Sequence, residues 1–476
     1  MQEGVVNLVR LETDTMGVVE VPVDKYWGAQ TQRALENFKV SSKTWHPEII
    51  KAIILIKKAA AETNKELNIL DPAKAELIIS ACDTILNNWE KYKDNFPLDI
   101  FQTGSGTSTN MNVNEVISNL ASELAGKQKG SKYIHPNDDV NKGQSSNDVI
   151  PTSIRIASYI FSINLIQKIQ ELLEAFKQKE KEFEGIIKTG RTHLMDATPI
   201  LLSQEFSGYT RQIELSIERI KDSIKRLREL PIGGTAVGTG INTHKEFGKL
   251  VTQKINGYLK NYYPNIDFSL YPDLKETTNH FEAQASIDTF IELMCAYKTY
   301  CLALMKITND IRWMGSGPVG GIGELFIPEL QPGSSIMPGK VNPVIPEAVG
   351  MACAYCIGLE YSLNIVNQYS NFELSTTFPL VALAISESFQ ILYNITSLIK
   401  DKLILNLKPN LERIQNIVNF NPSLVTPLAK IVGYDKAAEI FKKALQEKLT
   451  IKEYVLKYNI LPKDQAEELL NLSKMV

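Results

Sequence analysis

The sequence contains little that points to a secreted, nucleic-acid-binding or membrane protein. Its 476 residues include only five cysteines, an odd number scattered through apolar surroundings, which predicts reduced thiols in a reducing compartment. The 51 basic and 54 acidic side chains nearly cancel to a net charge of −3, so no global charge favours nucleic acid or an anionic membrane. No apolar run reaches the roughly 18 residues of a membrane span, because residues such as Arg155 and Asn164 interrupt the longest candidates. We therefore expect no nucleic-acid partner and no membrane partner.

Targeting and metal-binding signals are missing as well. The first residues, MQEGVVNLVRLETD, have neither a basic segment followed by an apolar core nor an Arg- and Ser-rich amphipathic pattern, which predicts a cytoplasmic protein. The C-x-x-C formed by Cys353 and Cys356 has no second Cys or His pair nearby. Because it lies in an apolar, helix-like run, core packing is favoured over zinc binding. We expect neither a metal nor an organic cofactor.

Long amphipathic patterns dominate the rest of the chain. In the stretch 199–230, Ile213, Ile217, Ile220 and Ile224 are spaced four, three and four residues apart, as in a helix packed lengthwise against others. Stretches of this kind predict five long helices, which imply a helix bundle. Two shorter helices precede them at 47–67 and 72–94, and small helices follow residue 407. The five long helices are expected at 151–183, 199–230, 278–314, 348–369 and 377–399.

These patterns divide the chain into three predicted domains. Residues 1–142 form an N-terminal domain that starts with brief strands, residues 143–405 form the central long-helix bundle, and residues 406–476 form a small C-terminal helical domain. Some bundle helices carry apolar residues outside a single stripe, such as Leu293 and Ala296. We therefore expect a mainly α protein whose helices are buried on more than one side, in part by other subunits.

The segment 333–343, GSSIMPGKVNP, is the loop with the most chemical groups. It combines four glycine or proline breakers with a serine pair, a lysine and an asparagine, a composition suited to a loop around an anion. Ser334 offers a hydroxyl and backbone N–H groups, Lys340 a compact cation and Asn342 an amide. Glu347 follows five residues after Asn342. A mobile surface loop with incidental polar residues is the alternative interpretation.

Other polar segments lie between the predicted helices. The segment 102–114, QTGSGTSTNMNVN, fits either a solvated linker or a partly buried stretch, and 134–148 reads IHPNDDVNKGQSSND. The glycine-rich segment 231–243 lacks the lysine of a phosphate loop, so it predicts a turn near the site. The segment 315–320, GSGPVG, formally matches a dinucleotide fingerprint but follows a helix, which argues against that function.

The segment 188–199, KTGRTHLMDATP, places Thr192 and His193 between two long helices. A lone histidine is more often a structural hydrogen-bonding group than a catalyst. His193, however, is flanked by Arg191 and Asp196 at a helix junction, so it is a fair acid–base candidate.

Taken together, these segments resemble the aspartase/fumarase superfamily, and class II fumarases in particular. Residues 333–343 fit the superfamily signature, a serine pair followed by Ile-Met-Pro-x-Lys-x-Asn, without a gap. Aspartases carry glutamine at the His193 position, and Met195 departs from fumarases, which usually have glutamine there. The resemblance covers nearly the whole chain. Its other fumarase-like segments are TGSGT at 103–107, HPNDDVN at 135–141, QSSND at 144–148 and GRTH at 190–193.

This resemblance implies a fold, an assembly and a reaction. The fold is the three-domain, mainly α superfamily fold, which forms a homotetramer around a twenty-helix core, with active sites shared between subunits. The reaction is the reversible hydration of the small dicarboxylate fumarate to L-malate, by anti addition and elimination of water through an aci-carboxylate. An aspartate ammonia-lyase is the alternative. A second alternative is a catalytically silent relative. Such a relative is expected to lack Ser334, Lys340 or His193, and all three are present.

The resemblance also implies roles for individual residues. Ser334 is the base, Lys340 and Asn342 hold the substrate carboxylate, and His193, supported by Glu347, handles the leaving water. These roles suit the chemistry, since N–H donors and a lysine stabilise a doubly charged aci-carboxylate, and a serine base needs its anion stabilised. His135, Asn137 and Asp138 resemble a second anion site. The remaining substrate oxygens would be bound by Ser105, Thr107, Ser145, Ser146, Asn147 and Thr192.

Overall fold

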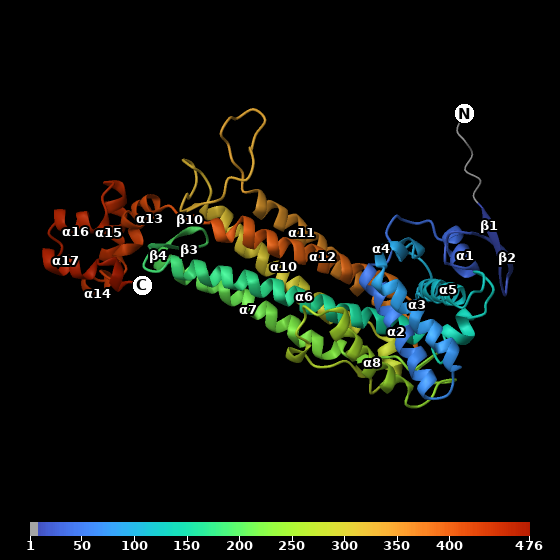
Figure 1. Ribbon diagram of the computed structural model, residues 1–476. Helices are drawn as coiled ribbons and strands as arrows, with labels where there is room; N and C mark the ends of the chain where they lie inside the picture. The colour runs from blue at the N-terminus through green and yellow to red at the C-terminus, as the bar shows by residue number, and fades with distance from the viewer. Residues whose placement is uncertain (1–7) are drawn as a thin grey trace. The chain divides into compact units, whose positions relative to one another are not determined.

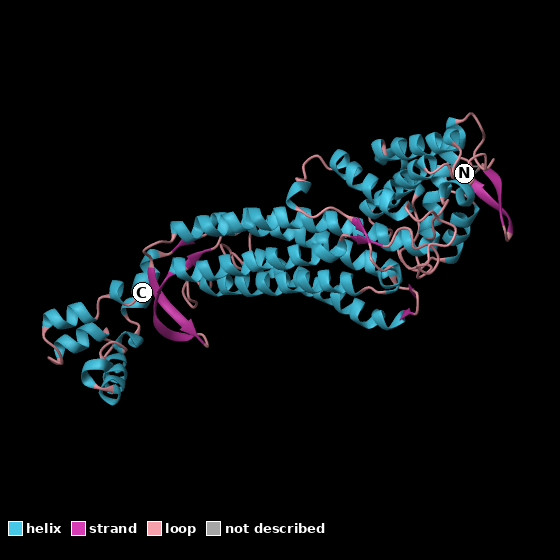
Figure 2. Ribbon diagram, turned by 90° about the horizontal axis from the view of Figure 1, so that it is seen from below, coloured by secondary structure: helices cyan, strands magenta, loops and turns pink. Residues whose placement is uncertain are grey.

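The computed structural model describes residues 8–476, which divide into two compact units. Unit 1 comprises residues 8–166, 219–298 and 355–391, and unit 2 comprises 167–218, 299–354 and 392–476. Helices dominate both units, and the strands form five short two-stranded pairs, so the mainly α prediction is confirmed (Figures 1 and 2). The division of the chain into three domains at residues 142 and 405 stays a prediction.

The five long helices expected from the sequence are present, and each contributes residues to both units. The first begins at Ser146, five residues before Pro151, because a capping box starts it: the Ser145 Oγ accepts the Asn147 N–H at 3.2 Å and the Asp148 carboxylate accepts the Ser145 N–H at 2.9 Å. The five are α6 (Ser146–Glu182), α7 (Leu202–Leu227), α10 (Asp288–Met314), α11 (Val344–Val366) and α12 (Phe378–Lys402).

Two of the predicted long helices have the wrong boundaries, and the shorter predicted helix 72–94 ends early, because Asn88 separates α3 (Pro72–Asn87) from α4 (Trp89–Tyr92). Pro199 does not open a helix, because it lies in β4 (Met195–Leu201), which pairs with β3 (Ile187–Thr192). The stretch 278–314 is not one helix, because Ser286 adopts an extended backbone conformation between α9 (His280–Ala285) and α10. The first change matters for function, since it places the predicted loop around His193 on a β-hairpin.

Three helices of nine residues or more were not predicted in the described part of the chain, α1 (Ala29–Asn37), α5 (Thr107–Leu124) and α8 (Phe247–Tyr262). The segment that contains the start of α5 looked like a linker because its first turns are polar. Asn112 and Asn114 are nevertheless buried, and their amide groups donate to the Asn95 carbonyl and the Asn141 side chain at 2.9 and 3.1 Å. These hydrogen bonds offset the cost of burying polar groups, so α5 is a core helix that buries asparagines beside apolar residues such as Val113, Val116 and Ile117.

Within unit 1, α2 (Pro47–Glu66) packs against α3 (Pro72–Asn87) and α8, while α3 also contacts α5 (Figure 1). Both α2 and α3 begin with a proline at a position that tolerates the missing N–H, as the sequence predicted. Isoleucines cover the buried face of α2, where Ile53, Ile54 and Ile56 are fully buried. A polar residue on this face of α2 would therefore lie among apolar side chains.

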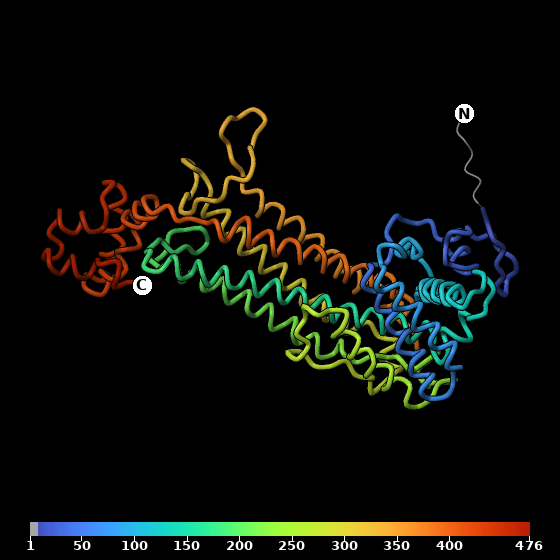
Figure 3. Tube along the Cα trace, viewed as in Figure 1, coloured from blue at the N-terminus to red at the C-terminus, as the bar shows by residue number. Residues whose placement is uncertain are grey.

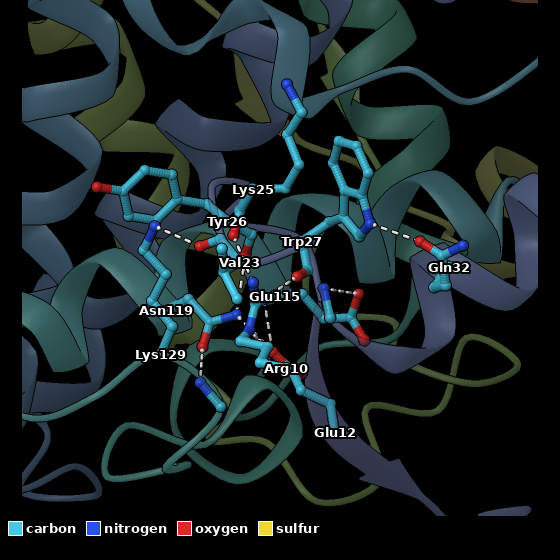
Figure 4. A network of polar contacts seen from close by, with 12 residues as sticks. Arg10, Glu12, Val23, Lys25, Tyr26, Trp27, Gln32, Glu115, Asn119 and Lys129 are labelled. Carbon is cyan, nitrogen blue, oxygen red and sulfur yellow. Dashed lines mark hydrogen bonds and ion pairs between the residues drawn. The ribbon is translucent and has the colours of Figure 1, made fainter. Parts of the chain in front are cut away.

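Arg10 connects several segments at the start of unit 1 through hydrogen bonds (Figure 4). Its guanidinium pairs with the Glu12 carboxylate at 2.6 Å. Glu115 on α5 accepts the N–H of Gly28 at 2.9 Å, and a Cβ on Gly28 would lie 2.6 Å from a Glu12 oxygen, so a larger residue there would require a glutamate side chain to move. The other acceptors of Arg10 are the carbonyl oxygens of Pro22, Lys25 and Trp27, at 2.6 to 2.8 Å.

The last helices of unit 2 form a small core of their own. Leu428, Ile440, Val455 and Ala466 are among its buried residues. The predicted helix near residue 434 and the one after Pro462 are both present. The helices of this core are α14 (Ala429–Val432), α15 (Tyr434–Gln446), α16 (Ile451–Lys457) and α17 (Lys463–Leu469), whereas α13 (Leu411–Asn419) before them contacts β3.

Three helical stretches are long and apolar enough to cross a membrane by length and composition alone, Ser146–Glu182, Val344–Tyr369 and Phe378–Asn406. This corrects the expectation that no stretch reaches that length. In the first, 94% of the most apolar window is buried inside the protein, so its apolar residues are already packed. The second stretch is different, because only 28% of its window is buried and Met351 and Tyr361 are exposed.

Candidate active site

Hydroxyl groups from two helix starts meet in unit 1. The Oγ of Ser105 lies 2.7 Å from Thr107 Oγ1, which lies 2.8 Å from Ser146 Oγ. Thr107 is the first residue of α5 and Ser146 the first of α6, so two helix N-termini begin at this cluster. The helix dipole at such ends favours an anion, although the N–H groups of Ser108, Thr109 and Asn147 already donate to side-chain oxygens. The fold therefore brings together three of the predicted substrate-binding residues around groups suited to a carboxylate.

Ser145 and Asn147 continue this cluster along the chain. The Asn147 side chain donates to the carbonyl of Ala236 at 2.8 Å, so the glycine-rich turn 231–243 lies directly against the segment. The turn is tightly fitted, because a Cβ on Gly234 would lie 2.0 Å from the side-chain oxygen of Gln284. The predicted turn therefore contacts the candidate binding residues.

Two buried ionisable residues next to this segment were not predicted. Lys57 and Asp148 are fully buried. Burial lowers the pKa of Lys57 to about 7 and raises the pKa of Asp148 to about 6, because each charged form loses contact with water. For Lys57, the sequence signal is a lysine inside the apolar run AIILIKKAAA.

His193 lies at the tip of the β3–β4 hairpin in unit 2. Thr192 pairs with Met195, which leaves His193 and Leu194 as a two-residue turn with φ values of 56° and 60°. A turn with both central residues in the left-handed region matches the twist of a hairpin but usually holds Asn or Gly. Leu194 and Met195 are 63% and 70% exposed. The hairpin thus presents His193 to the surface of unit 2.

A buried ion network anchors the base of this hairpin. The Glu324 carboxylate, with no exposed side-chain area, contacts Arg191 at 2.7 Å and Lys188 at 2.9 Å. Burial alone would raise the pKa of Glu324, but the hydrogen bonds and charges of Arg191 and Lys188 outweigh it and lower that pKa. Lys188 also contacts Glu205 at 2.7 Å. Glu324 lies shortly after the segment 315–320 that resembled a dinucleotide fingerprint, and the sequence did not reveal this role.

The 333–343 loop extends away from α10 and α11 (Figure 3). Two hydrogen bonds close it, from the Gly333 N–H to the Lys340 carbonyl and from the Asn342 side chain to the Gly333 carbonyl, both at 2.7 Å. Inside the loop, the Ser334 Oγ accepts the N–H groups of Ile336 and Met337 at 3.2 and 3.0 Å. These two donors would stabilise a Ser334 alkoxide. Lys340 and Glu347 are exposed, the latter in the first turn of α11.

The residues of the predicted second anion site surround a different cavity. His135 and Asn137 line a cavity of about 220 Å³ in unit 1, together with three acidic residues. His135 Nδ1 accepts the backbone N–H of Asn137 at 3.2 Å, while Asp138 is 80% exposed and does not line the cavity. The acidic residues are Glu12, Asp14 and Glu115, and Lys132 is the lysine among the lining residues. Three carboxyl groups beside one lysine weigh against an anion in this cavity.

The predicted site residues therefore fall into groups. Unit 1 carries the Ser105 cluster and the His135 cavity, and unit 2 carries the hairpin and the 333–343 loop. Within residues 8–476, no hydrogen bond joins the side chain of Thr192 or His193 to the loop, and no group of three or more His, Cys, Asp or Glu is placed to hold a metal ion. No group brings Ser334 and His193 into contact.

Comparison with known proteins identifies the family. The Lyase family model matches residues 17–358, and the Fumarase C C-terminus model matches residues 424–476. Fumarate hydratase class II of Thermus aquaticus is 45% identical over 464 residues, which cover 97% of each chain. Its counterpart from Bacillus subtilis is 43% identical over 468 residues, covering 98% of each.

A solved structure supports the same relationship. The class II fumarase from Schistosoma mansoni superposes with a TM-score of 0.94 at 35% identity, covering 98% of this chain and 99% of that one. The superfamily fold predicted from the sequence is confirmed by this match. The predicted family is confirmed as well, and this chain belongs to the class II fumarate hydratases, a family of lyases.

Proposed function

We infer that this chain catalyses the reversible hydration of fumarate to L-malate. The observation that carries this conclusion is the 45% identity, over 97% of both chains, to a fumarate hydratase class II. The hydroxyl cluster at two helix N-termini fits a dicarboxylate substrate. His193 stands where aspartases carry glutamine, which favours loss of water over loss of ammonia.

We propose that Ser334 removes the proton from the carbon next to a carboxylate of malate. The product of this step is an aci-carboxylate with two negative charges on one group, and the barrier falls when donors already point at that group. The support is local: two backbone N–H groups already donate to the Ser334 Oγ, as an alkoxide base requires. Lys340 and Asn342 would then bind the charged carboxylate, although in the free loop the amide of Asn342 donates to Gly333.

His193, supported by Glu347, would protonate the hydroxyl that leaves as water on the opposite face of the substrate. The exposed position of His193 at a hairpin tip allows it to reach a substrate held by other elements. The remaining substrate oxygens would be bound by Ser105, Thr107, Ser145, Ser146, Asn147 and Thr192. A second anion site at His135, Asn137 and Asp138 would have to overcome repulsion from the neighbouring carboxyl groups.

We also propose a cytoplasmic homotetramer whose active sites are shared between subunits. The main support is α11, an apolar helix with exposed Met351 and Tyr361 at 71% and 63%. Leu194 and Met195 at the hairpin tip are also exposed. Burying such residues against other copies of the chain would stabilise an assembly, since each Å² of apolar surface removed from water contributes about 25 cal/mol. Five thiols without a disulfide fit a reducing compartment.

The reaction is tested by following the ultraviolet absorbance of fumarate as it forms from malate, in buffer with a chelator. We expect turnover of malate and none of aspartate. Turnover of aspartate alone would favour the ammonia-lyase alternative. Activity that disappears with the chelator and returns only with a divalent ion would contradict the expectation that no cofactor is needed.

The shared site is tested by complementation. Ser334→Ala and His193→Asn proteins, each nearly inactive, are unfolded together and refolded as a mixture. Some sites in mixed tetramers would then draw both intact residues from different chains, so partial activity should return. Proteins refolded separately and then mixed are the control. If verified mixed tetramers stay inactive, the two residues act from the same chain.

A further inference from the structure

The segment 141–148 carries three of the proposed binding residues and is held on one side by Lys57. Lys57 belongs to α2, and its side chain is fully buried among isoleucines of the same helix. Its Nζ donates to the side-chain oxygens of Asn141 at 2.8 Å and Gln144 at 2.9 Å. In the described part of the chain, no carboxylate lies within ion-pairing distance of this ammonium group. A buried cation is thus used to hold two amide side chains of one segment.

On the other side the segment is held by Asp148, which is also fully buried. One carboxylate oxygen accepts the N–H of Ser145 at 2.9 Å. The other accepts the N–H groups of Gly233 and Thr235 at 3.1 and 3.0 Å. Asp148 therefore joins the start of α6 to the glycine-rich turn with three charge-assisted hydrogen bonds, each stronger than a neutral one.

The glycine-rich turn that Asp148 binds has unusual backbone dihedral angles. Gly233 has a φ of 100°, and Thr235 has a φ of 52°, which a β-branched residue rarely adopts. The hydrogen bonds to Asp148 stabilise this conformation. The carbonyl of Ala236 in the same turn then accepts a hydrogen bond from the Asn147 side chain. Asp148 thus fixes Asn147 in two ways, through the start of α6 and through the glycine-rich turn.

Lys57 and Asp148 also stabilise one another across the segment. The charge of Lys57 offsets part of the rise in the pKa of Asp148, and the charge of Asp148 offsets part of the fall in the pKa of Lys57. The segment 141–148 lies between these opposite buried charges.

We propose that Lys57 and Asp148 are positioning residues, which fix Ser145, Ser146 and Asn147 in the geometry that binds the dicarboxylate without touching it. This inference rests on the proposed function of that segment. A pair that only balances charge would be replaceable, because a neutral pair of similar shape often substitutes for a buried ion pair without loss of stability. A positioning pair is not replaceable in this way, since an amide at position 148 offers one acceptor oxygen where the carboxylate offers two.

The experiment compares Lys57→Met, Asp148→Asn and the double variant with the wild-type enzyme. Each single variant removes buried hydrogen bonds and leaves the other buried charge unbalanced, so its midpoint of chemical unfolding should fall; the double variant restores the charge balance but not the hydrogen bonds, so it should recover part of that loss. The double variant should nevertheless keep a kcat/KM for malate at least tenfold below wild type, with a KM increase at least as large as the kcat decrease. Recovery of both stability and kcat/KM to within threefold would overturn the proposal.

Two further variants complete the design. Asp148→Glu keeps the negative charge, so it can be used if the neutral variants do not fold. It moves the carboxylate by one methylene and should lower kcat/KM about tenfold. A change below twofold would overturn the proposal. Lys58→Met is the matched control, since Lys58 is adjacent on α2 but pairs with Asp83. Its kcat/KM should stay within twofold of wild type. Wild-type enzyme that fails to turn over malate would refute the proposed function itself, a result distinct from all of these.

Discussion

Replacing Glu324 with glutamine is expected to destabilise the protein more than any other single neutral substitution near the candidate site. The Glu324 carboxylate has no exposed area and serves two cations, Arg191 at 2.7 Å and Lys188 at 2.9 Å. A glutamine fills the same volume but removes the negative charge. The two cations would then remain at the base of the hairpin without their shared counter-ion.

The expected loss in the free energy of unfolding follows from the burial of each cation. Removing one member of a buried ion pair typically costs about 3–5 kcal/mol, because the remaining charge stays desolvated. Lys188 is 1% exposed but keeps Glu205 at 2.7 Å, and Arg191 is 16% exposed and can be partly hydrated. Both features place the expected loss near the lower end, about 3 kcal/mol in the free energy of unfolding.

The assay is chemical denaturation at pH 7 and one fixed protein concentration, since assembly makes stability depend on concentration. Glu205→Gln is the matched control: it also contacts Lys188, but Glu205 is 23% exposed, so a loss below about 1 kcal/mol is expected. If Glu324→Gln destabilises no more than this control, Glu324 does not anchor the hairpin.

The pH dependence gives an independent check. The pKa of Glu324 is lowered in the folded protein, so its stabilising effect is fully present above the unfolded pKa of about 4.3 and is lost as pH falls through the lower folded value. The difference in stability between wild type and Glu324→Gln should therefore be constant near neutral pH and shrink as pH falls below about 4. A difference that grows in acid would contradict the assigned charge state.

Three further predictions concern the loops and the turn. Ser334→Ala should nearly abolish malate turnover without changing the midpoint of unfolding, measured by circular dichroism; near-normal kcat would mean that another group is the base. His193→Asn should lower kcat about 10²–10⁴-fold, the usual contribution of a general acid or base, in the same absorbance assay. Gly234→Ala should lower the free energy of unfolding by about 1–3 kcal/mol, because its methyl group would overlap the Gln284 oxygen 2.0 Å away; a neutral result would show that Gln284 moves freely.

The long helices were predictable because their burial follows a 3.6-residue period. In α7, Ile213, Ile220 and Ile224 are almost completely buried, as their spacing indicated. The helix α5 shows the limit of this reasoning. The side-chain N–H groups of its buried asparagines donate to partners elsewhere in the sequence, such as Asn95 and Asn141, so the local sequence alone does not distinguish these polar turns from a solvated loop.

The candidate site shows the same division between local and tertiary information. Ser334 and Asn342 could be singled out because their loop is built from neighbouring residues, and its closing hydrogen bonds span nine residues or fewer. Lys57, Asp148 and Glu324 act on segments that are remote in the sequence, so the sequence alone did not assign them a role. A charged residue within an apolar run, as at Lys57, is the one local signal that could have been weighed.

Some of the residues proposed for chemistry are exposed, whereas buried residues hold the segments that carry the proposed site. His193 and Lys340 are exposed in the single chain, while Asp148 and Glu324 are fully buried. Preorganised charges and dipoles stabilise a transition state most in a site from which water is excluded, so exposed catalytic groups need cover. The exposed apolar face of α11 offers a surface through which other copies of the chain can supply that cover.

Catalysis should therefore depend on assembly. We expect malate turnover per chain to fall as the enzyme is diluted, in proportion to the fraction of tetramer measured in parallel by light scattering or mass photometry. Full activity in verified monomers would show that one chain builds a complete site, and the argument from exposure would then be wrong. Tyr361→Lys places a charge on the exposed surface of α11, well beyond the first turn that carries Glu347, and should shift both the dissociation and the loss of activity to higher protein concentration together. A shift in dissociation alone would separate assembly from catalysis.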